Sequence, residues 1–153
     1  MSRAVVRLLF VGLLCVGTPF MFWPAQADAM EGEERELMID VMNDYMSEST
    51  HTQGMVTPEQ VQVSYLGVAQ ILDTREAEQY EQSHIPDALH MEWREVLDRL
   101  DEIATDKPVV LYCGTGALSA QAGFALRVLG YSNVVIMRGG YRDWLKLVAP
   151  SMK

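Results

Sequence analysis

One cysteine stands at a position suited to nucleophilic chemistry. Cys113 directly follows the apolar, β-branched run PVVLY at residues 108–112, a pattern that is typical of a buried strand. Five residues, Gly-Thr-Gly-Ala-Leu, separate it from Ser119, where we expect a helix to begin. Two glycines in so short a connection permit backbone angles that other residues resist. The spacing predicts a tight loop between a strand and a helix, with a thiol at the start of the loop.

A loop of this kind can stabilise a thiolate. Its N–H groups can turn inward as an anion-binding cradle, and the start of the helix adds partial positive charge. The cradle would consist of Gly114, Thr115, Gly116, Ala117, Leu118 and Ser119. Ser119 is also the expected N-cap and a hydroxyl donor to the sulfur, with Thr115 as a second donor. The pKa of a cysteine at a helix N-terminus falls below the free value of about 8.5. The alternative is an inert thiol that ends a core strand.

The elements around this loop alternate between strand and helix from residue 55 to residue 149. Strands are predicted at 69–72, 88–91, 108–112 and 133–137. Helices are predicted at 75–82, 93–103, 119–129 and 141–148, and a short one begins at Pro58 after the capping residue Thr57. This order predicts an α/β domain at 55–149, with an open parallel sheet of about five strands and helices on both faces. Such sheets bind ligands at the carboxyl ends of their strands, where Cys113 stands.

An acidic segment precedes that domain. Residues 28–54 hold eight acids and one arginine, and a helix is predicted at 33–47, followed by a polar loop. The apolar residues that recur at helical spacing are Leu37, Met38, Val41, Met42 and Tyr45. We expect this stripe to pack on an apolar patch of the main domain. The alternative is that the helix docks a partner.

Composition excludes several classes of function. The net charge of −9 disfavours nucleic acid and anionic membrane surfaces as partners, because both attract Lys and Arg patches. Two cysteines cannot form a disulfide scaffold or a Cys-rich zinc site, and the three histidines have no close ligand spacing. We therefore expect no metal and no bound cofactor.

The first 27 residues have the features of a signal peptide. Arg3 and Arg7 precede an apolar run of about 16 residues, and Ala25-Gln26-Ala27 offers a small-x-small cleavage site. The run is shorter than the roughly 20 residues of a spanning helix, and Pro19 interrupts it, so an uncleaved anchor is the weaker interpretation. We expect cleavage before Asp28, a periplasmic or secreted protein without a membrane span, and a net charge that moves from −9 to −11 as the two arginines are removed. Cys113 would then be the only cysteine.

Motifs along residues 57–148 resemble the rhodanese homology domain, the sulfurtransferase fold. The quoted residues are Asp73-Thr74-Arg75-Glu76, Tyr80, His84-Ile85-Pro86-Asp87-Ala88, Cys113 with Gly116 and Ser119, Gly130-Tyr131, and Gly139-Gly140-Tyr141 with Trp144. They stand in the order and at the spacing of that family. The resemblance implies that Cys113 takes a sulfane sulfur from a donor, becomes a persulfide, and passes the sulfur to a nucleophilic acceptor. It also implies a place beside the loop for Asp73. We expect Asp73 and Arg75 to support the site, Arg75 as a buried structural cation; a catalytic role for the two is the alternative.

The loop departs from many thiosulfate-using members, which carry Arg or Lys where this chain has Gly114 and Leu118. Thiosulfate is a dianion, and hydrogen bonds to charged groups contribute roughly 1.5–3 kcal/mol each. We therefore expect a persulfide or polysulfide to be a better donor than thiosulfate, unless Arg75 or Arg94 reaches the site. The expected acceptors are cyanide or a thiol, including a protein thiol.

Two further interpretations remain. A non-catalytic sulfur-carrier or protein-binding module of the same fold would account for the absence of loop cations. A related Cys-based phosphatase or arsenate reductase would need a loop one residue longer that ends in Arg. This chain has five residues between Cys113 and Ser119 and no such Arg. An exported sulfurtransferase is the preferred prediction.

Overall fold

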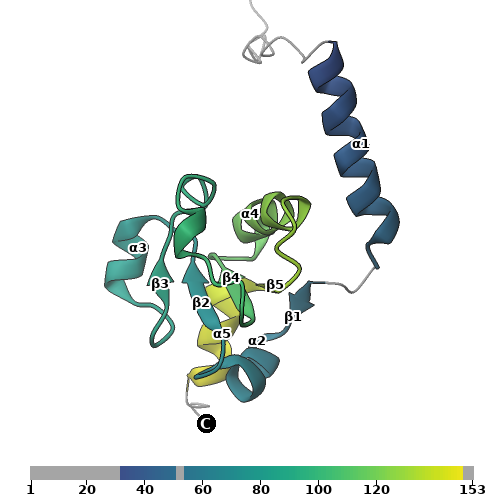
Figure 1. Ribbon diagram of the computed structural model, residues 1–153. Coiled ribbons are helices and arrows are strands. Elements are labelled where there is room, and N and C mark those ends of the chain that lie inside the picture. The colour runs from purple at the N-terminus through teal and green to yellow at the C-terminus, as the bar shows by residue number, and fades with distance from the viewer. Residues whose placement is uncertain (1–31, 51–53, 150–153) are drawn as a thin grey trace, which may run out of the picture. The chain divides into compact units, whose positions relative to one another are not determined.

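The computed structural model of the protein describes residues 32–50 and 54–149 (Figure 1). The expected signal peptide at 1–27, and residues 28–31 and 51–53 of the acidic segment, lie outside the described residues. In the part of the chain that is described, no helix has the length and hydropathy needed to cross a membrane.

The domain is built on one parallel sheet of five strands. The strands are β1 (Met55–Val56), β2 (Gln70–Asp73), β3 (Leu89–His90), β4 (Val109–Tyr112) and β5 (Val134–Met137). Their order across the sheet is β1-β5-β4-β2-β3, and every pairing is parallel. All four residues of the central strand β4 are buried, as a strand covered on both faces requires. The predicted open parallel sheet is confirmed.

Helices follow the strands, and all but the last of them lie in crossovers between two strands. They are α2 (Pro58–Gln60), which continues into a π-helical turn at Val61–Tyr65, then α3 (Ala77–Gln82), α4 (Ala117–Val128) and α5 (Gly140–Val148). Thr57 caps α2 as predicted: its hydroxyl accepts from the backbone N–H of Gln60, and the Gln60 side chain accepts from the N–H of Thr57.

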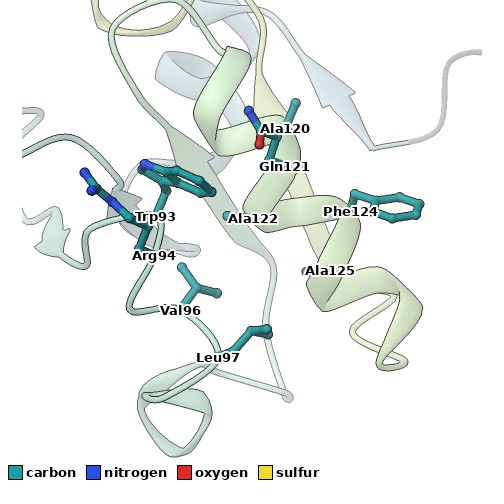
Figure 2. A pocket seen from close by; sticks show the side chains of 9 residues that line it. All are labelled: Trp93, Arg94, Val96, Leu97, Ala120, Gln121, Ala122, Phe124 and Ala125. Carbon is teal, nitrogen blue, oxygen red and sulfur yellow. The ribbon is translucent and has the colours of Figure 1, made fainter. Parts of the chain in front are cut away.

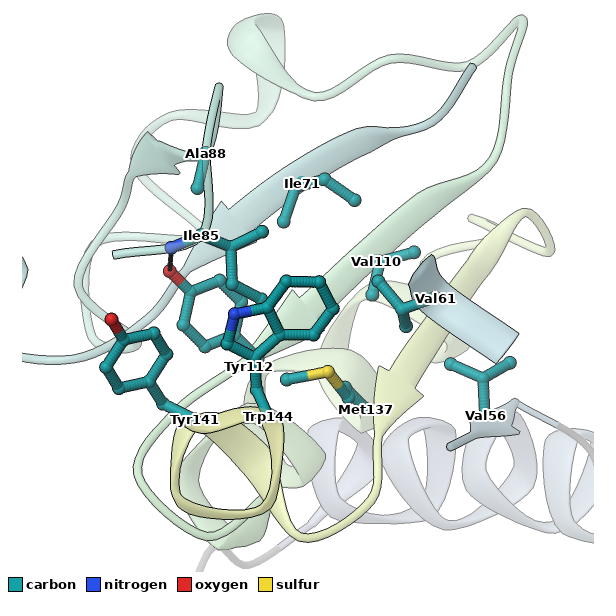
Figure 3. Close-up of a cluster of buried hydrophobic side chains, with 10 residues drawn as sticks. All are labelled: Val56, Val61, Ile71, Ile85, Ala88, Val110, Tyr112, Met137, Tyr141 and Trp144. Carbon is teal, nitrogen blue, oxygen red and sulfur yellow. Dashed lines mark hydrogen bonds between the residues drawn. The ribbon is translucent and has the colours of Figure 1, made fainter. Parts of the chain in front are cut away.

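Alternate residues of β4 point into two separate cores. Val110 and Tyr112 belong to a cluster with Trp144 of α5, which Figure 3 shows together with the hydrogen bond from the Ile85 N–H to the Tyr112 hydroxyl. Val109 and Leu111 belong to the other cluster, which includes Ala122 and Leu126 of α4. The period of two along β4 therefore places α4 and α5 in different cores.

The helix predicted at 93–103 is wrong. Residues 93–99 form successive turns, and only Leu100–Glu102 is helical, as a 3-10 turn. The backbone bonds here span three residues, as from the Glu95 N–H to the Glu92 carbonyl and from the Asp98 N–H to the Glu95 carbonyl. These tighter turns bury Val96 and Ile103. The apolar spacing therefore indicated which residues are buried, but not that the backbone forms turns and a 3-10 helix.

The acidic helix forms as predicted, but its apolar stripe is not buried. Helix α1 spans Glu33–Glu48 and contains no buried residue; 64% of the Leu37 surface is exposed. Its contacts to the sheet domain centre on Tyr45, whose ring meets Phe124 edge-on with centroids 5.5 Å apart. The Tyr45 hydroxyl accepts a hydrogen bond from the Arg127 Nε at 2.8 Å. The expectation that the whole stripe covers an apolar patch is therefore wrong, because Leu37, Met38 and Val41 are exposed and only Met42 and Tyr45 are half-buried.

Candidate active site

Cys113 lies at the carboxyl end of β4, inside the loop that leads to α4. Its surface is only 2% exposed. The backbone N–H of Gly116 donates to the Cys113 Sγ at 3.2 Å, and the Ser119 hydroxyl lies 3.7 Å from the same sulfur as a donor. The sulfur is thus held by a backbone donor and a hydroxyl, both supplied by the seven-residue segment that the sequence singled out.

These donors and the burial of the sulfur act in opposite directions on the pKa of the thiol. Burial alone raises the pKa of Cys113, because it disfavours the anion. The backbone N–H groups of Ser119, Thr115 and Gly116, together with the Ser119 hydroxyl, lower it and outweigh burial. The net result is a pKa below the ordinary value of a thiol, in the predicted direction. This environment favours a thiolate, the nucleophilic form.

The helix after the loop begins earlier than predicted. α4 starts at Ala117, and its N-cap is Gly116 in the left-handed region at φ 98°. A side chain at Gly116 would also crowd the Met137 carbonyl at 3.3 Å. Ser119 therefore lies in the first helical turn and is not the N-cap; the single hydrogen of its hydroxyl is shared between the Gly116 carbonyl at 3.0 Å and the Cys113 sulfur at 3.7 Å. Thr115 acts on the sulfur through its backbone N–H, whereas a side-chain donor was expected.

The other cradle positions form the outer surface of the loop. Gly114 is half-buried, and a Cβ there would meet open space. Ala117 and Leu118 are exposed. The positions where a loop cation would stand are therefore sterically open to one, although this chain does not provide it.

A second element holds the loop from behind. The backbone N–H of Tyr141 donates to the Cys113 carbonyl at 2.8 Å, and that of Arg142 donates to the Gly114 carbonyl at 3.1 Å. Gly140, at φ 58°, allows this approach, since a Cβ on it would lie 2.7 Å from the Thr115 nitrogen. The Gly139-Gly140 pair belongs to the residues that carry the family resemblance, which did not predict this backbone contact. The paired glycines were the signal that a backbone packs closely here.

Asp73 and Arg75 form a buried ion pair. The Arg75 Nε donates to both carboxylate oxygens of Asp73 at 2.9 and 3.0 Å, and its Nη2 donates to the Ser83 carbonyl. The guanidinium carbon of Arg75 lies 4.1 Å from the centre of the Tyr141 ring. Arg75 therefore contacts the residue that supports the Cys113 carbonyl, and it is placed to support α5 rather than to contact the sulfur.

The cations considered for thiosulfate binding are engaged elsewhere. Arg75 is paired with Asp73, and the Arg94 Nε donates to the Glu92 carboxylate at 3.0 Å. Arg142, which approaches the loop through its backbone, pairs its side chain with Asp143 at 3.3 Å. Within residues 32–50 and 54–149, no group of three or more His, Cys, Asp or Glu side chains is arranged to hold a metal ion.

This geometry fits a nucleophile that carries a transferable anionic group. A thiolate attacks an electrophilic atom, and the inward N–H groups then stabilise negative charge on the atom it has gained. Among the described residues, the loop between Cys113 and Ser119 carries no charged side chain, while the backbones of Arg138 and Arg142 flank it. The arrangement suits a single small atom that the Cys113 sulfur has gained.

Comparison with known proteins agrees with the geometry. The family model described as "Rhodanese-like domain" matches residues 57–147. The chain is 34% identical over 89 residues to the thiosulfate sulfurtransferase GlpE of Pseudomonas syringae pv. syringae, covering 58% of this chain and 84% of GlpE. It is 37% identical over 76 residues to the protein YqhL of Bacillus subtilis, covering 50% of this chain and 60% of YqhL. The structure of the human single-domain sulfurtransferase TSTD1 aligns with a TM-score of 0.55 and 26% identity, covering 61% of this chain and 96% of that one.

Proposed function

The chain belongs to the rhodanese-like family, and from that premise we propose that this sulfurtransferase transfers a sulfane sulfur through a persulfide on Cys113. The observation that carries the proposal is the pair of donors on the sulfur, the Gly116 N–H at 3.2 Å and the Ser119 hydroxyl at 3.7 Å. They favour the thiolate before transfer, and N–H groups of the same loop would stabilise the negative charge of the persulfide after it.

The reaction consists of two displacements at one sulfur. The Cys113 thiolate attacks the outer sulfur of the donor; a new S–S bond forms, the donor's bond to that sulfur breaks, and the leaving group departs with the bonding electron pair. With thiosulfate the leaving group is sulfite, and with a persulfide it is a thiolate. A thiolate or cyanide then attacks the outer sulfur of the Cys113 persulfide, and the Cys113 thiolate leaves. Thiocyanate or a new persulfide is the product, and the enzyme returns unchanged.

The donor is proposed to be a persulfide or polysulfide rather than thiosulfate. One charged sulfur can be held by N–H groups and a helix start, but a dianion with three outer oxygens needs further positive groups in place of its lost hydration. Gly114 and Leu118 supply none, and Arg75 and Arg94 are paired with Asp73 and Glu92. The acidic net charge of the chain adds a weaker, salt-screened repulsion.

We also propose that the protein is exported, cleaved before Asp28, and active in the periplasm or outside the cell. Arg3, Arg7, the apolar run and the Ala25-Gln26-Ala27 site support this. N-terminal sequencing of the protein from cell fractions tests it. We expect Asp28 as the first residue of the exported form. The full-length chain in the cytoplasmic fraction would contradict the proposal.

Steady-state kinetics with two substrates test the transfer itself. A persulfide intermediate predicts parallel lines when the reciprocal of the rate is plotted against the reciprocal of the donor concentration at several acceptor concentrations. The reason is that the two substrates never occupy the enzyme together. Cys113→Ser should abolish turnover and leave the fold intact. A sulfur carrier without catalysis would be loaded by the donor but would show no turnover with small thiols or cyanide.

A further inference from the structure

An apolar groove lies between α4 and the turns at 93–97 (Figure 2). Its volume is about 650 Å³, within the range of small-molecule sites. Trp93, Leu97, Phe124 and Ala125 are among the residues that line it, and Ala120 lies at one end. Leu97 is 51% exposed, so an apolar wall is open to solvent without a covering segment among the described residues.

One end of this groove is tied to the active-site loop on both walls. On the α4 side, the Ala120 N–H donates to the carbonyl of Gly116, the residue whose own N–H bonds the Cys113 sulfur. On the other side, the Trp93 N–H donates to the Thr74 carbonyl, and the Thr74 hydroxyl donates to the carbonyl of Tyr112, the residue before Cys113. Ala120, which lines this end of the groove, directly follows Ser119, whose hydroxyl faces the Cys113 sulfur, so the groove begins one residue beyond the active-site loop.

The charge at the rim favours hydrocarbon over an anion. Arg94 is the cation that lines the groove, and its Nε is bonded to the Glu92 carboxylate at 3.0 Å. Its guanidinium carbon lies 5.6 Å from the centre of the Trp93 ring, so the cation also covers an aromatic face. With its charge balanced by Glu92, the rim offers little net attraction to a dianion, while the aromatic and aliphatic wall gains from burying an apolar group.

We propose that this groove binds the apolar organic group of the sulfur donor, an organic persulfide R–S–SH in which R is an aryl or branched alkyl group. The inference rests on the sulfur transfer proposed above and names the donor class. R lies along α4 and the outer sulfur meets Cys113. The Cys113 thiolate attacks that sulfur, the S–S bond of the donor breaks, R–S⁻ leaves with the electron pair, and the proton of the persulfide passes to water.

Two donors and a filled groove test the proposal. Benzyl hydropersulfide supplies an apolar R, and sodium tetrasulfide supplies sulfur with none. In the wild type we expect kcat/KM for benzyl hydropersulfide to exceed that for tetrasulfide by about tenfold or more, the discrimination that a small apolar pocket achieves. Ala125→Phe should fill the groove and lower kcat/KM for the benzyl donor by about tenfold, mainly through KM, with tetrasulfide turnover changed less than about twofold.

Two further variants and a binding measurement complete the design. Ala77→Phe places the same ring on an exposed position of α3 that does not line the groove. It should leave kcat/KM unchanged for both donors. Leu97→Gln changes an exposed position, so folding should stay intact. It should lower kcat/KM for the benzyl donor more than for tetrasulfide. Calorimetry should show that benzyl mercaptan binds to the Cys113→Ser variant. Adding Ala125→Phe to that variant should remove the binding.

The outcomes separate this inference from the proposed function. Equal kcat/KM for the two donors, or equal loss with both in Ala125→Phe and Leu97→Gln, would overturn the groove as the donor site. Absence of sulfur transfer from every donor, or full turnover by Cys113→Ser, would instead overturn the sulfur transfer itself.

Discussion

The backbone N–H of Tyr141 donates to the carbonyl oxygen of Cys113 at 2.8 Å, so the last helix of the domain holds the nucleophile's own backbone. The Tyr141 ring lies under the Arg75 guanidinium, which is fixed by Asp73. A chain of contacts therefore runs from the buried ion pair after β2, through α5, to the loop after β4. Cys113 is positioned by segments that are distant in sequence as well as by its own loop.

Gly140→Ala should displace the active-site loop where it contacts the start of α5, and so lower both stability and kcat. A Cβ at this position would press on the Cys113 carbonyl and the Thr115 nitrogen, and the residue has φ 58°. We expect a loss of about 1–3 kcal/mol in the free energy of unfolding and at least a tenfold loss in kcat. Gly130→Ala is the matched control, because Gly130 also has positive φ, at 95°, but has open space around its Cβ. The control should lose about 1 kcal/mol and keep its activity; equal loss of kcat in both variants would refute the supporting role.

The reactivity of Cys113 should depend on pH with a midpoint below that of a free thiol. Its pKa is lowered, so the thiolate persists to lower pH and is lost only as the pH falls through the folded-state value. Ser119→Ala removes a donor to the sulfur and should shift the profile to higher pH. The rate of alkylation by iodoacetamide against pH measures this, with Ser132→Ala, an exposed serine, as control. An unshifted profile in Ser119→Ala would show that the hydroxyl does not stabilise the thiolate.

Leu118→Arg should improve the use of thiosulfate. Leu118 is 38% exposed on the loop, so an arginine there can reach the approaching anion without burying its charge. An added binding contact should lower KM for thiosulfate about tenfold, with a smaller effect on tetrasulfide. Gly114→Arg, into open space, is a second version of the same test. Efficient thiosulfate turnover by the wild type with no gain in either variant would show that another cation already serves the site.

Helix α1 should contribute little to the stability of the domain. It contains no buried residue, and Tyr45 supplies the hydrogen bond to Arg127 and the edge-on contact with Phe124. We expect removal of residues 32–50 to lower the free energy of unfolding by about 1 kcal/mol. This is the contribution of one hydrogen bond, here the one between the half-buried side chains of Tyr45 and Arg127. Tyr45→Phe should reproduce most of that loss, with Tyr65→Phe as a control in the sheet domain. A loss above about 3 kcal/mol would show that the apolar stripe does pack on the domain.

The parts of the site that are local in sequence could be predicted. An apolar β4, the glycines of the loop and the apolar face of α4 are encoded within about 20 residues, and they placed Cys113 at a strand end. The support from Gly140 and Tyr141 could not be predicted, because it depends on how β5 pairs with β4. The position of Ser119 in the first helical turn depended on the left-handed angle of Gly116, which a residue type permits but does not require.

Two elements show where periodicity misleads. Residues 93–103 have apolar spacing that fits both 3.0 and 3.6 residues per turn, and the structure uses the tighter one. The apolar residues of α1 have helical spacing and form a helix, yet spacing does not say whether a face has a partner, and most of this face stays exposed. Asp87 shows a local choice that no periodicity encodes: it adopts φ 61°, which aspartate tolerates.

The mass of the protein after treatment with a sulfur donor tests the central claim most directly. Wild type exposed to benzyl hydropersulfide and freed of excess donor should gain about 32 Da, one sulfur atom, located on the peptide that contains Cys113. The added mass should disappear on addition of cyanide, with thiocyanate formed in equal amount, and Cys113→Ser should never acquire it. An unmodified Cys113 in an enzyme that still turns over, or the same gain in Cys113→Ser, would contradict a persulfide on Cys113 as the intermediate.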